Sequence, residues 1–167
     1  MELKQVMGDP DEGDRLLSTL ARLTHRLRML PAALIAVVKG AAIGGGCGLT
    51  CVCDYTLTHD QCVMGFPEVD LGLCPAVVAP WVVRRMGIGP ARELLLGGGT
   101  LDGKRAAEIG LVTASFPQIE DLDNEAERLS ATLCRAGPEA LRATKRLLNE
   151  LDGSGSAAEV LRGAKLS

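Results

Sequence analysis

The sequence predicts an α/β domain. A β-branched run at residues 34–38 leads into a glycine-rich stretch and a helix of small residues, and amphipathic segments bounded by Gly or Pro fill the second half. Strand and helix patterns that alternate with short links are typical of α/β folds. Because the strand patterns are concentrated early in the 167 residues, we expect the sheet in the first two thirds and helices after it.

The individual elements follow from hydrophobic spacing and from breaker residues. Leucines at helical spacing predict a first helix over residues 14–30, which Pro31 ends. β-Branched or alternating runs predict strands over residues 34–38, 54–58, 63–66 and 111–113. Helices are predicted over residues 77–86, 90–96, 103–109, 121–135 and 138–151. The Gly/Ser-rich residues 152–156 are predicted to form a linker.

Composition narrows the class of protein. Apolar residues make up 47% of the chain and charged residues 23%, as in ordinary globular proteins. A net charge of −3 argues against a nucleic-acid partner, which would require a basic face. No uninterrupted apolar run is long enough for a membrane span, and the polar start shows no signal peptide. Six cysteines in apolar segments are expected to be free buried thiols, so we expect an intracellular, soluble protein.

The glycine run Gly44–Gly46 is the first chemical signal. Without side chains, this backbone lets a ligand atom approach peptide N–H groups at the start of a helix, where they lack intrahelical partners. Such a site can hold a phosphate or a developing thioester oxyanion, although the glycines could also serve tight packing alone. Neither the Lys-Ser/Thr of a P-loop nor the GxGxxG spacing of a dinucleotide site is present.

Glu68 is the second chemical signal. Its neighbours Phe66, Val69 and Leu71 are apolar, and burial among them would raise the pKa of the carboxyl toward the pH at which it works. That shift suits proton transfer at carbon. A lone glutamate is more often a surface residue, and its pairing with the glycine run favours the functional interpretation.

Several motifs in order resemble the enoyl-CoA hydratase/isomerase (crotonase) signature, over about three quarters of the chain. They are residues 35–49 with the glycine run, Cys53-Asp54, residues 65–73 with Pro67-Glu68, residues 91–98, residues 106–112 and residues 140–145. The resemblance implies a crotonase-like spiral of ββα units, here incomplete and followed by C-terminal helices. It implies a partial acyl-CoA-binding domain over residues 1–152, with residues 153–167 as linker and short tail.

The same resemblance implies a chemistry. An acyl-CoA thioester would be the substrate, with no cofactor beyond the coenzyme A that it carries, and homotrimers or hexamers would be the assembly. Gly45 would supply one of two N–H groups that hold the thioester oxygen of an enolate. Glu68 matches the acid/base glutamate of the Pro-Glu motif, but Gly48 stands where hydratases have a second glutamate. One carboxylate can move a proton between the α- and γ-carbons, so isomerisation is favoured over hydration.

Substrate contacts are expected from residues near these two groups. We expect them to be Gly44, Gly46, Gly48, Pro67, Leu71 and Trp81. Residues 75–83 depart from the commoner Pro-Gly-Ala-Gly-Gly-Thr pattern and resemble methylglutaconyl-CoA hydratase-like members. Trp81 in this segment could line the acyl pocket or pack in the core or a subunit contact.

The ends of the chain suggest an alternative. Residues 1–4 resemble the segment just after the family's first oxyanion-hole stretch, so the first donor is expected upstream of Met1, and the C-terminal helices are also expected to be cut short. The alternative function is therefore an inactive truncated crotonase-like protein that acts, if at all, by assembling with other subunits.

Other residues carry weaker signals. A metal site at Cys47, Cys51, Cys53, His59 and Cys62 is rejected, because no CxxC pair occurs. His25 is expected at the surface of its helix. Arg84, Arg85, Arg92, Lys104 and Arg105 could meet coenzyme A phosphates, and a solvated helix face is the preferred interpretation.

Overall fold

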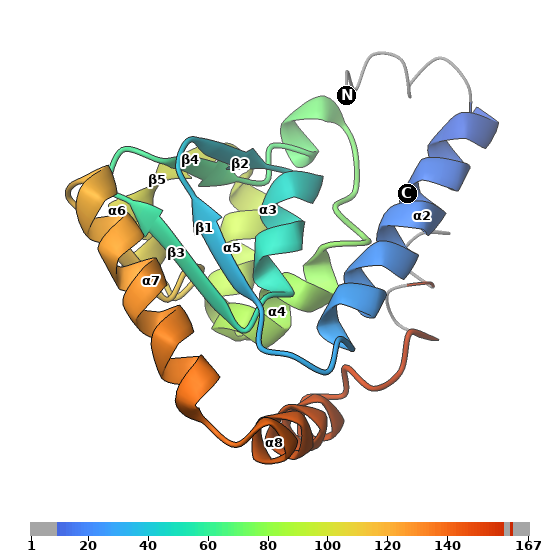
Figure 1. The fold of residues 1–167 in the computed structure, drawn as a ribbon. Coiled ribbons are helices and arrows are strands. Elements are labelled where there is room, and N and C mark those ends of the chain that lie inside the picture. Colours follow the sequence, from blue (N-terminus) through green and yellow to red (C-terminus); the bar gives the residue numbers. More distant parts are fainter. Residues whose placement is uncertain (1–9, 159–160, 162–167) are drawn as a thin grey trace.

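A computed structural model describes residues 10–158 and residue 161. The described elements run in the order α2 (Pro10–Arg28), β1 (Ile35–Val38), β2 (Ala41–Ile43), α3 (Gly45–Cys51), β3 (Tyr55–His59), β4 (Val63–Gly65), η1 (Val69–Leu71), α4 (Ala79–Met86), α5 (Ile88–Gly97), β5 (Thr100–Asp102), α6 (Gly103–Glu108), β6 (Ala114–Phe116), α7 (Ile119–Arg135) and α8 (Pro138–Leu151). The predicted α/β class is confirmed (Figure 1). The segment at residues 1–4 lies outside the described residues.

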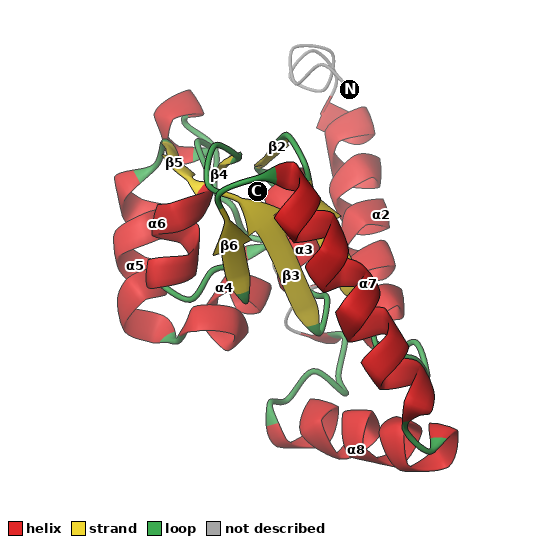
Figure 2. Cartoon of the chain, turned by 60° about the vertical axis from the view of Figure 1, so that its left-hand side comes forward, coloured by secondary structure: helices red, strands yellow, loops and turns green. Residues whose placement is uncertain are grey.

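The strands form two small sheets. The first has the order β1-β3-β6 and is parallel throughout, with Ile35 opposite Tyr55 and Leu57 opposite Ala114. The second has the order β2-β4-β5, in which β4 pairs parallel to β2 and antiparallel to β5. Helix α7 packs against the first sheet, and Figure 2 shows it crossing the face of β3.

The core lies between the sheets and helices α3 to α6. Its largest fully buried side chains are Trp81, Phe66, Met64 and Leu111, whereas Leu57 of β3 and Leu122 of α7 are buried outside this cluster. Helix α3 buries Cys47, Gly48 and Cys51, and Ala21 of α2 is fully buried in the same cluster. Small residues on α3 let neighbouring elements come close, so the glycine-rich helix occupies the centre of the domain.

Helix α8 lies apart from both sheets. It runs from the end of α7 toward the end of α2 (Figure 1). Three of its leucines are 54%, 54% and 74% exposed: Leu147, Leu148 and Leu151. A cleft of about 450 Å³ separates α8 from the residues that follow α2, with Met29, Pro31 and Arg142 among its walls.

Three expectations about local structure are wrong. The strand expected at residues 111–113 lies at Ala114–Phe116 instead, because Leu111 and Val112 are buried in the core after α6. The three-residue strands β2 and β5 were not expected. Cysteines are not uniformly buried: Cys47, Cys51 and Cys62 are buried, Cys53 is half-buried, and Cys74 and Cys134 are exposed.

Candidate functional site

The start of α3 is held by glycine geometry. Gly44 precedes the helix with a φ of 56°, a conformation that favours glycine. Its N–H donates to the carbonyl of Gly65 on β4 at 2.8 Å, and its carbonyl accepts from Gly48 at 2.9 Å. Gly45 is the first residue of α3, so its N–H belongs to the first turn and has no acceptor within the helix. The glycine run therefore begins a helix, and the N–H of Gly45 lies in its first turn.

Glu68 lies beside this helix start. A methyl group placed on Gly44 would lie 3.0 Å from Oε1 of Glu68, so the carboxylate faces the residue that precedes α3. The side chain is half-buried, and among the described residues Oε2 has no hydrogen-bond partner. Burial raises the pKa of the Glu68 carboxyl, and a hydrogen bond from its own backbone N–H opposes this shift. The structure thus brings Glu68 and the glycine run together.

The segment that carries Glu68 is fixed on both sides. Before it, the N–H of Phe66 donates to the carbonyl of Gly99 at 3.2 Å. After it, Oδ2 of Asp70 accepts from the N–H of Gly99 at 2.8 Å. The carbonyl of Glu68 itself accepts from Leu71 at 3.0 Å, which closes a short 3₁₀ turn. Asp70 lies within the quoted motif of residues 65–73, and its contact with Gly99 anchors the turn that follows Glu68.

Gly48 faces a neighbour that leaves it no room. A methyl group on Gly48 would overlap Cγ1 of Val78 and would lie 2.9 Å from its Cβ. Val78 is 3% exposed and belongs to the segment that departs from the commoner family pattern. At the position where the family resemblance leads us to expect a second glutamate, Val78 therefore takes the space that a side chain would need.

The other expected contact residues differ in exposure. Pro67 is half-buried, Leu71 is 48% exposed, and Gly46 has open space where a side chain would begin. Trp81 is 2% exposed and lies in the core, where Arg84 sits 5.2 Å above its ring. Of the two roles considered for Trp81, lining the acyl pocket or packing, this burial corresponds to packing in the core.

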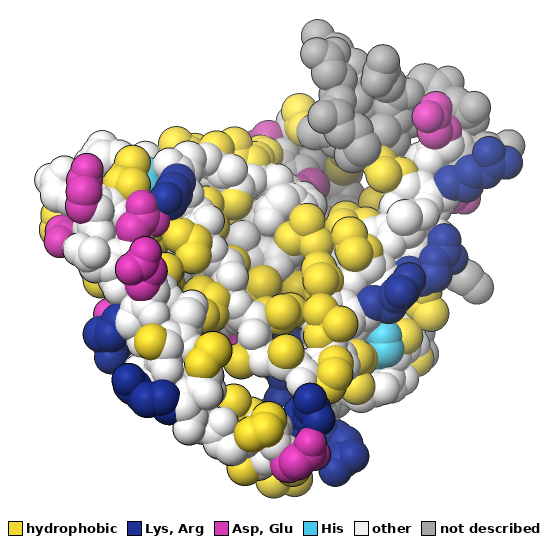
Figure 3. Space-filling model, viewed as in Figure 1, with side chains coloured by type: hydrophobic (Ala, Val, Ile, Leu, Met, Phe, Trp, Pro, Cys, Tyr) yellow, Lys and Arg dark blue, Asp and Glu magenta, His cyan; other side chains and the backbone are white. Residues whose placement is uncertain are grey.

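Exposed hydrophobic side chains surround the helix start and the turn of Glu68. They include Ile43, which precedes Gly44, and Val69 and Leu71 of the 3₁₀ turn. Figure 3 shows hydrophobic side chains gathered in the middle of the face beside α2. A surface of this kind can receive an apolar chain.

The solvated helix face expected for the basic residues of α4 is not observed. Arg84 and Arg85 do not form a solvated face: both are half-buried, and Arg85 donates to Thr56 Oγ1 at 2.6 Å. The solvated interpretation holds for Arg92, Lys104 and Arg105, which are exposed. His25 is half-buried rather than at the surface.

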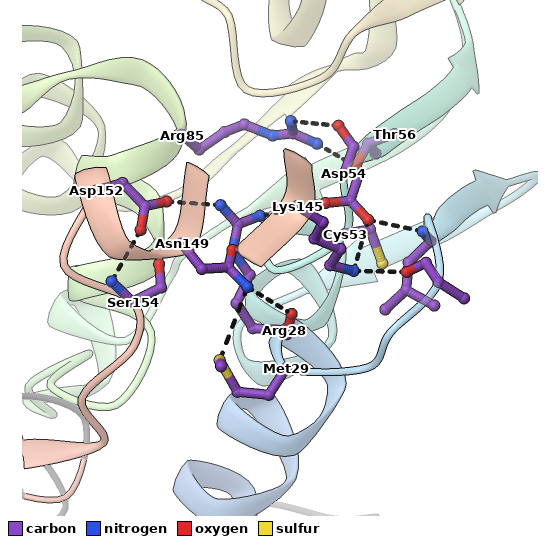
Figure 4. Close-up of polar contacts among 12 residues, drawn as sticks. Arg28, Met29, Cys53, Asp54, Thr56, Arg85, Lys145, Asn149, Asp152 and Ser154 are labelled. Carbon is purple, nitrogen blue, oxygen red and sulfur yellow. Dashed lines mark hydrogen bonds and ion pairs between the residues drawn. The ribbon is translucent and has the colours of Figure 1, made fainter. Parts of the chain in front are cut away.

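Arg85 belongs to a polar network that sequence reasoning missed (Figure 4). Asp54 is its centre: one carboxylate oxygen accepts from Lys145 at 2.8 Å and from the N–H of Leu34 at 2.7 Å. Arg28 joins it through the other carboxylate oxygen of Asp54 at 3.7 Å, and Arg28 also donates to Asp152 at 2.6 Å. The signal that could have indicated it is the pair Asp54 and Lys145, polar residues within two of the quoted motifs.

Comparisons with known proteins agree with this geometry. The model of the enoyl-CoA hydratase/isomerase family matches residues 2–159. The chain belongs to the enoyl-CoA hydratase/isomerase family. It is 33% identical over 145 residues to the 2,3-dehydroadipyl-CoA hydratase of Escherichia coli, covering 86% of this chain and 56% of that protein.

Solved structures of family members are similar to the fold. Pseudomonas aeruginosa AtuE matches with a TM-score of 0.81 at 36% identity, over 85% of this chain and 55% of that one. An enoyl-CoA hydratase/isomerase from Marinobacter aquaeolei matches with a TM-score of 0.81 at 31% identity, over 93% and 59%. The crotonase-like fold is confirmed, and this chain spans little more than half the length of these relatives.

The described residues contain neither a candidate metal site nor a helix that could span a membrane. No group of three or more His, Cys, Asp or Glu side chains among them could hold a metal ion. Within the same residues, no helix has the length and apolarity required to cross a membrane.

Proposed function

We propose that this chain binds an acyl-CoA thioester and shifts the double bond of an enoyl group through Glu68, with isomerisation favoured over hydration. The observation that carries the proposal is the pairing of one acid/base carboxylate with a blocked second position. Glu68 stands beside the start of α3, and Val78 fills the place of a second glutamate at Gly48. Coenzyme A enters as part of the substrate, and no other cofactor is required.

The reaction needs one group that takes a proton and returns it. The Glu68 carboxylate removes a proton from the α-carbon of a 3-enoyl thioester, and the electron pair passes to the thioester oxygen as an enolate. The N–H of Gly45 donates to that oxygen. Glu68 then returns the proton to the γ-carbon, and the double bond moves to the position next to the thioester. The raised pKa of Glu68 suits both directions of transfer, because acid and base forms are then closer in free energy.

Hydration requires a second functional group in addition to the proton carrier that isomerisation uses. A water molecule adding to the β-carbon must be oriented and deprotonated, and the family resemblance assigns this to two carboxylates. The E. coli relative is named a hydratase. The proposal is supported by Val78, which a side chain at Gly48 would overlap.

The test is a pair of assays on wild type and Glu68→Gln. Wild type should convert a 3-enoyl-CoA to the 2-enoyl-CoA faster than it hydrates crotonyl-CoA. Glu68→Gln should lose about 10²-fold or more of the isomerase rate, because the proton carrier is gone. Glu93→Gln, which changes an exposed carboxylate on α5, is the matched control and should retain the rate.

Two results would contradict the proposal. Hydration that outruns isomerisation in wild type would show that another group holds the water. Absence of both reactions in wild type, with acyl-CoA binding also absent, would favour the alternative of an inactive crotonase-like protein that acts through assembly.

We also propose self-association as a homotrimer or hexamer. Its support is the exposed leucine row on α8, since Leu148 and Leu151 are 54% and 74% exposed in the single chain. Light scattering should give a trimeric mass for wild type and a smaller mass for Leu148→Glu. A monomeric wild type would contradict it.

A further inference from the structure

A small cavity lies at the end of α3 remote from Gly45. It has a volume of about 90 Å³ and is lined by Arg28, Cys51, Trp81, Arg84 and Arg85. Arg28 is the last residue of α2, Cys51 ends α3, and the other three belong to α4. Three helices and three guanidinium groups therefore meet at one small space, separate from the Glu68 turn.

The walls offer hydrogen-bond donors without acceptors. The Nε of Arg28, the Nε of Arg85 and the Nε1 of Trp81 are buried, and none finds a partner among the described residues. Trp81 is 2% exposed, so its indole N–H is also shielded from bulk solvent. Arginine and tryptophan side chains only donate. A buried donor that lacks an acceptor is unfavourable, so these groups require an acceptor from outside the described residues.

The charges at this junction are unevenly matched. Arg28 is paired with Asp152 at 2.6 Å and with Asp54 at 3.7 Å, and Asp54 also accepts from Lys145 at 2.8 Å. Among the described residues, the hydrogen bonds of Arg85 go to neutral oxygens: it donates to Thr56 Oγ1 at 2.6 Å and to the backbone carbonyl of Asp54 at 3.4 Å. Burial and the nearby positive charge of Arg28 both lower the pKa of Arg85. A buried cation with neutral acceptors favours an anionic ligand.

Size limits what that anion can be. A space of about 90 Å³ is far below the few hundred cubic ångströms of drug-sized ligand pockets, so a nucleotide or an acyl-CoA does not fit. A tetrahedral oxyanion presents acceptors in several directions and carries a negative charge that complements the guanidinium group of Arg85.

We propose that this cavity binds one small inorganic oxyanion, such as phosphate or sulfate, which links α2 to α4. Its oxygens accept from Nε of Arg28, Nε of Arg85 and Nε1 of Trp81. The bound anion stabilises the folded chain, because it binds a site that exists only when the three helices are assembled. This inference is independent of the reaction at Glu68.

Equilibrium dialysis of the 167-residue chain with radiolabelled phosphate, and separately with sulfate, tests the proposal at constant ionic strength in sodium chloride. Wild type should bind one oxyanion per chain saturably, and the Tm should rise with oxyanion concentration. Saturable binding of either oxyanion supports the proposal. No saturable binding of either, or competition showing that chloride alone is bound, overturns it.

Variants locate the site. Trp81→Phe keeps an aromatic ring in the core and removes one donor, so affinity should fall about tenfold. Arg85→Met should abolish binding. Arg92→Met, an exposed arginine on α5, should bind as wild type does. Equal binding by Trp81→Phe, by folded Arg85→Met and by this control would place the ion at an adventitious surface site and overturn the proposal. Trp81→Phe decides alone if Arg85→Met does not fold.

Discussion

Val78 stands so close to Gly48 that no side chain fits between them: a methyl group on Gly48 would lie 2.9 Å from Cβ of Val78. The two residues come from α3 and from the turn before α4. Tight contact of a glycine with an aliphatic side chain is ordinary core packing, and here it also decides how many carboxylates can face the substrate. In the proposed function, this packing contact is what favours isomerisation over hydration.

Gly48→Glu should destabilise the chain on its own. Overpacking against Val78 should lower the free energy of unfolding by about 1–3 kcal/mol. Gly48→Glu with Val78→Gly removes the overlapping methyl groups, so this double variant should recover part of the stability lost and gain hydration of crotonyl-CoA. Chemical denaturation and the hydration assay measure the two effects, with Val78→Gly alone as control. A stable, active Gly48→Glu single variant would contradict the steric argument.

The isomerase rate should depend on the ionisation of Glu68. Burial raises its pKa above the ordinary value of 4.5, and the carboxylate is the form that removes a proton. The kcat/KM should therefore fall as the pH decreases through the raised pKa, which lies above 4.5. A pH–rate profile measures this limb. A limb at or below 4.5 would show that burial does not govern the group.

The same shift affects stability in the opposite sense. A raised pKa means that the folded state holds the Glu68 proton more tightly than the unfolded state, so stability from this group is present below pH 4.5 and is lost as the pH rises through the folded pKa. Glu68→Gln should consequently have a higher Tm than wild type at pH 7, and this difference should shrink toward pH 4. Thermal unfolding at several pH values measures it, and a lower Tm for Glu68→Gln at pH 7 would contradict the assignment.

Asp70 should act on the reaction by positioning Glu68. Its carboxylate accepts from the N–H of Gly99, and Asp70→Ala leaves that turn unfixed. We expect kcat to fall by about tenfold with little change in KM, because the proton carrier is misplaced while the substrate surface remains. Stability should fall by about 1 kcal/mol. Asp70→Asn keeps an acceptor oxygen and should restore most of the rate; a failure to do so would point to the charge of Asp70 instead.

Lys145 should be the most costly of the α8 residues to replace. Its ammonium donates to Asp54 and to the carbonyl of Ala32, and its side chain is 10% exposed. Lys145→Met leaves the Asp54 carboxylate with one fewer cation and should lower the free energy of unfolding by about 2–4 kcal/mol. Arg146→Met, at the exposed neighbouring position, is the control and should change it by less than about 0.5 kcal/mol. Equal losses of stability in the two variants would mean that the network around Asp54 does not hold α8 in place.

Much of the fold and the outline of the site could be predicted from local pattern alone. Leucines at helical spacing indicated α2, and α7 and α8 lie where their amphipathic faces and Pro138 placed them. β-Branched runs indicated β1 and β3. The glycine run with Pro67-Glu68 indicated the two halves of the site, because an exposed helix start and an apolar setting for a carboxylate are both visible along the chain.

Tertiary structure alone decided what depends on residues distant in sequence. Strands β2 and β5 are three residues long and exist because β4 pairs with both, which no local pattern reports. The apolar residues Leu111 and Val112 predict a strand. They are instead buried after α6, and the strand begins three residues later than expected, at Ala114. The contact of Val78 with Gly48, the anchoring of Glu68 through Asp70, and the network around Asp54 follow in the same way. Hydrophobic periodicity shows that a face is buried, whereas the partner that buries it is selected only when the chain packs.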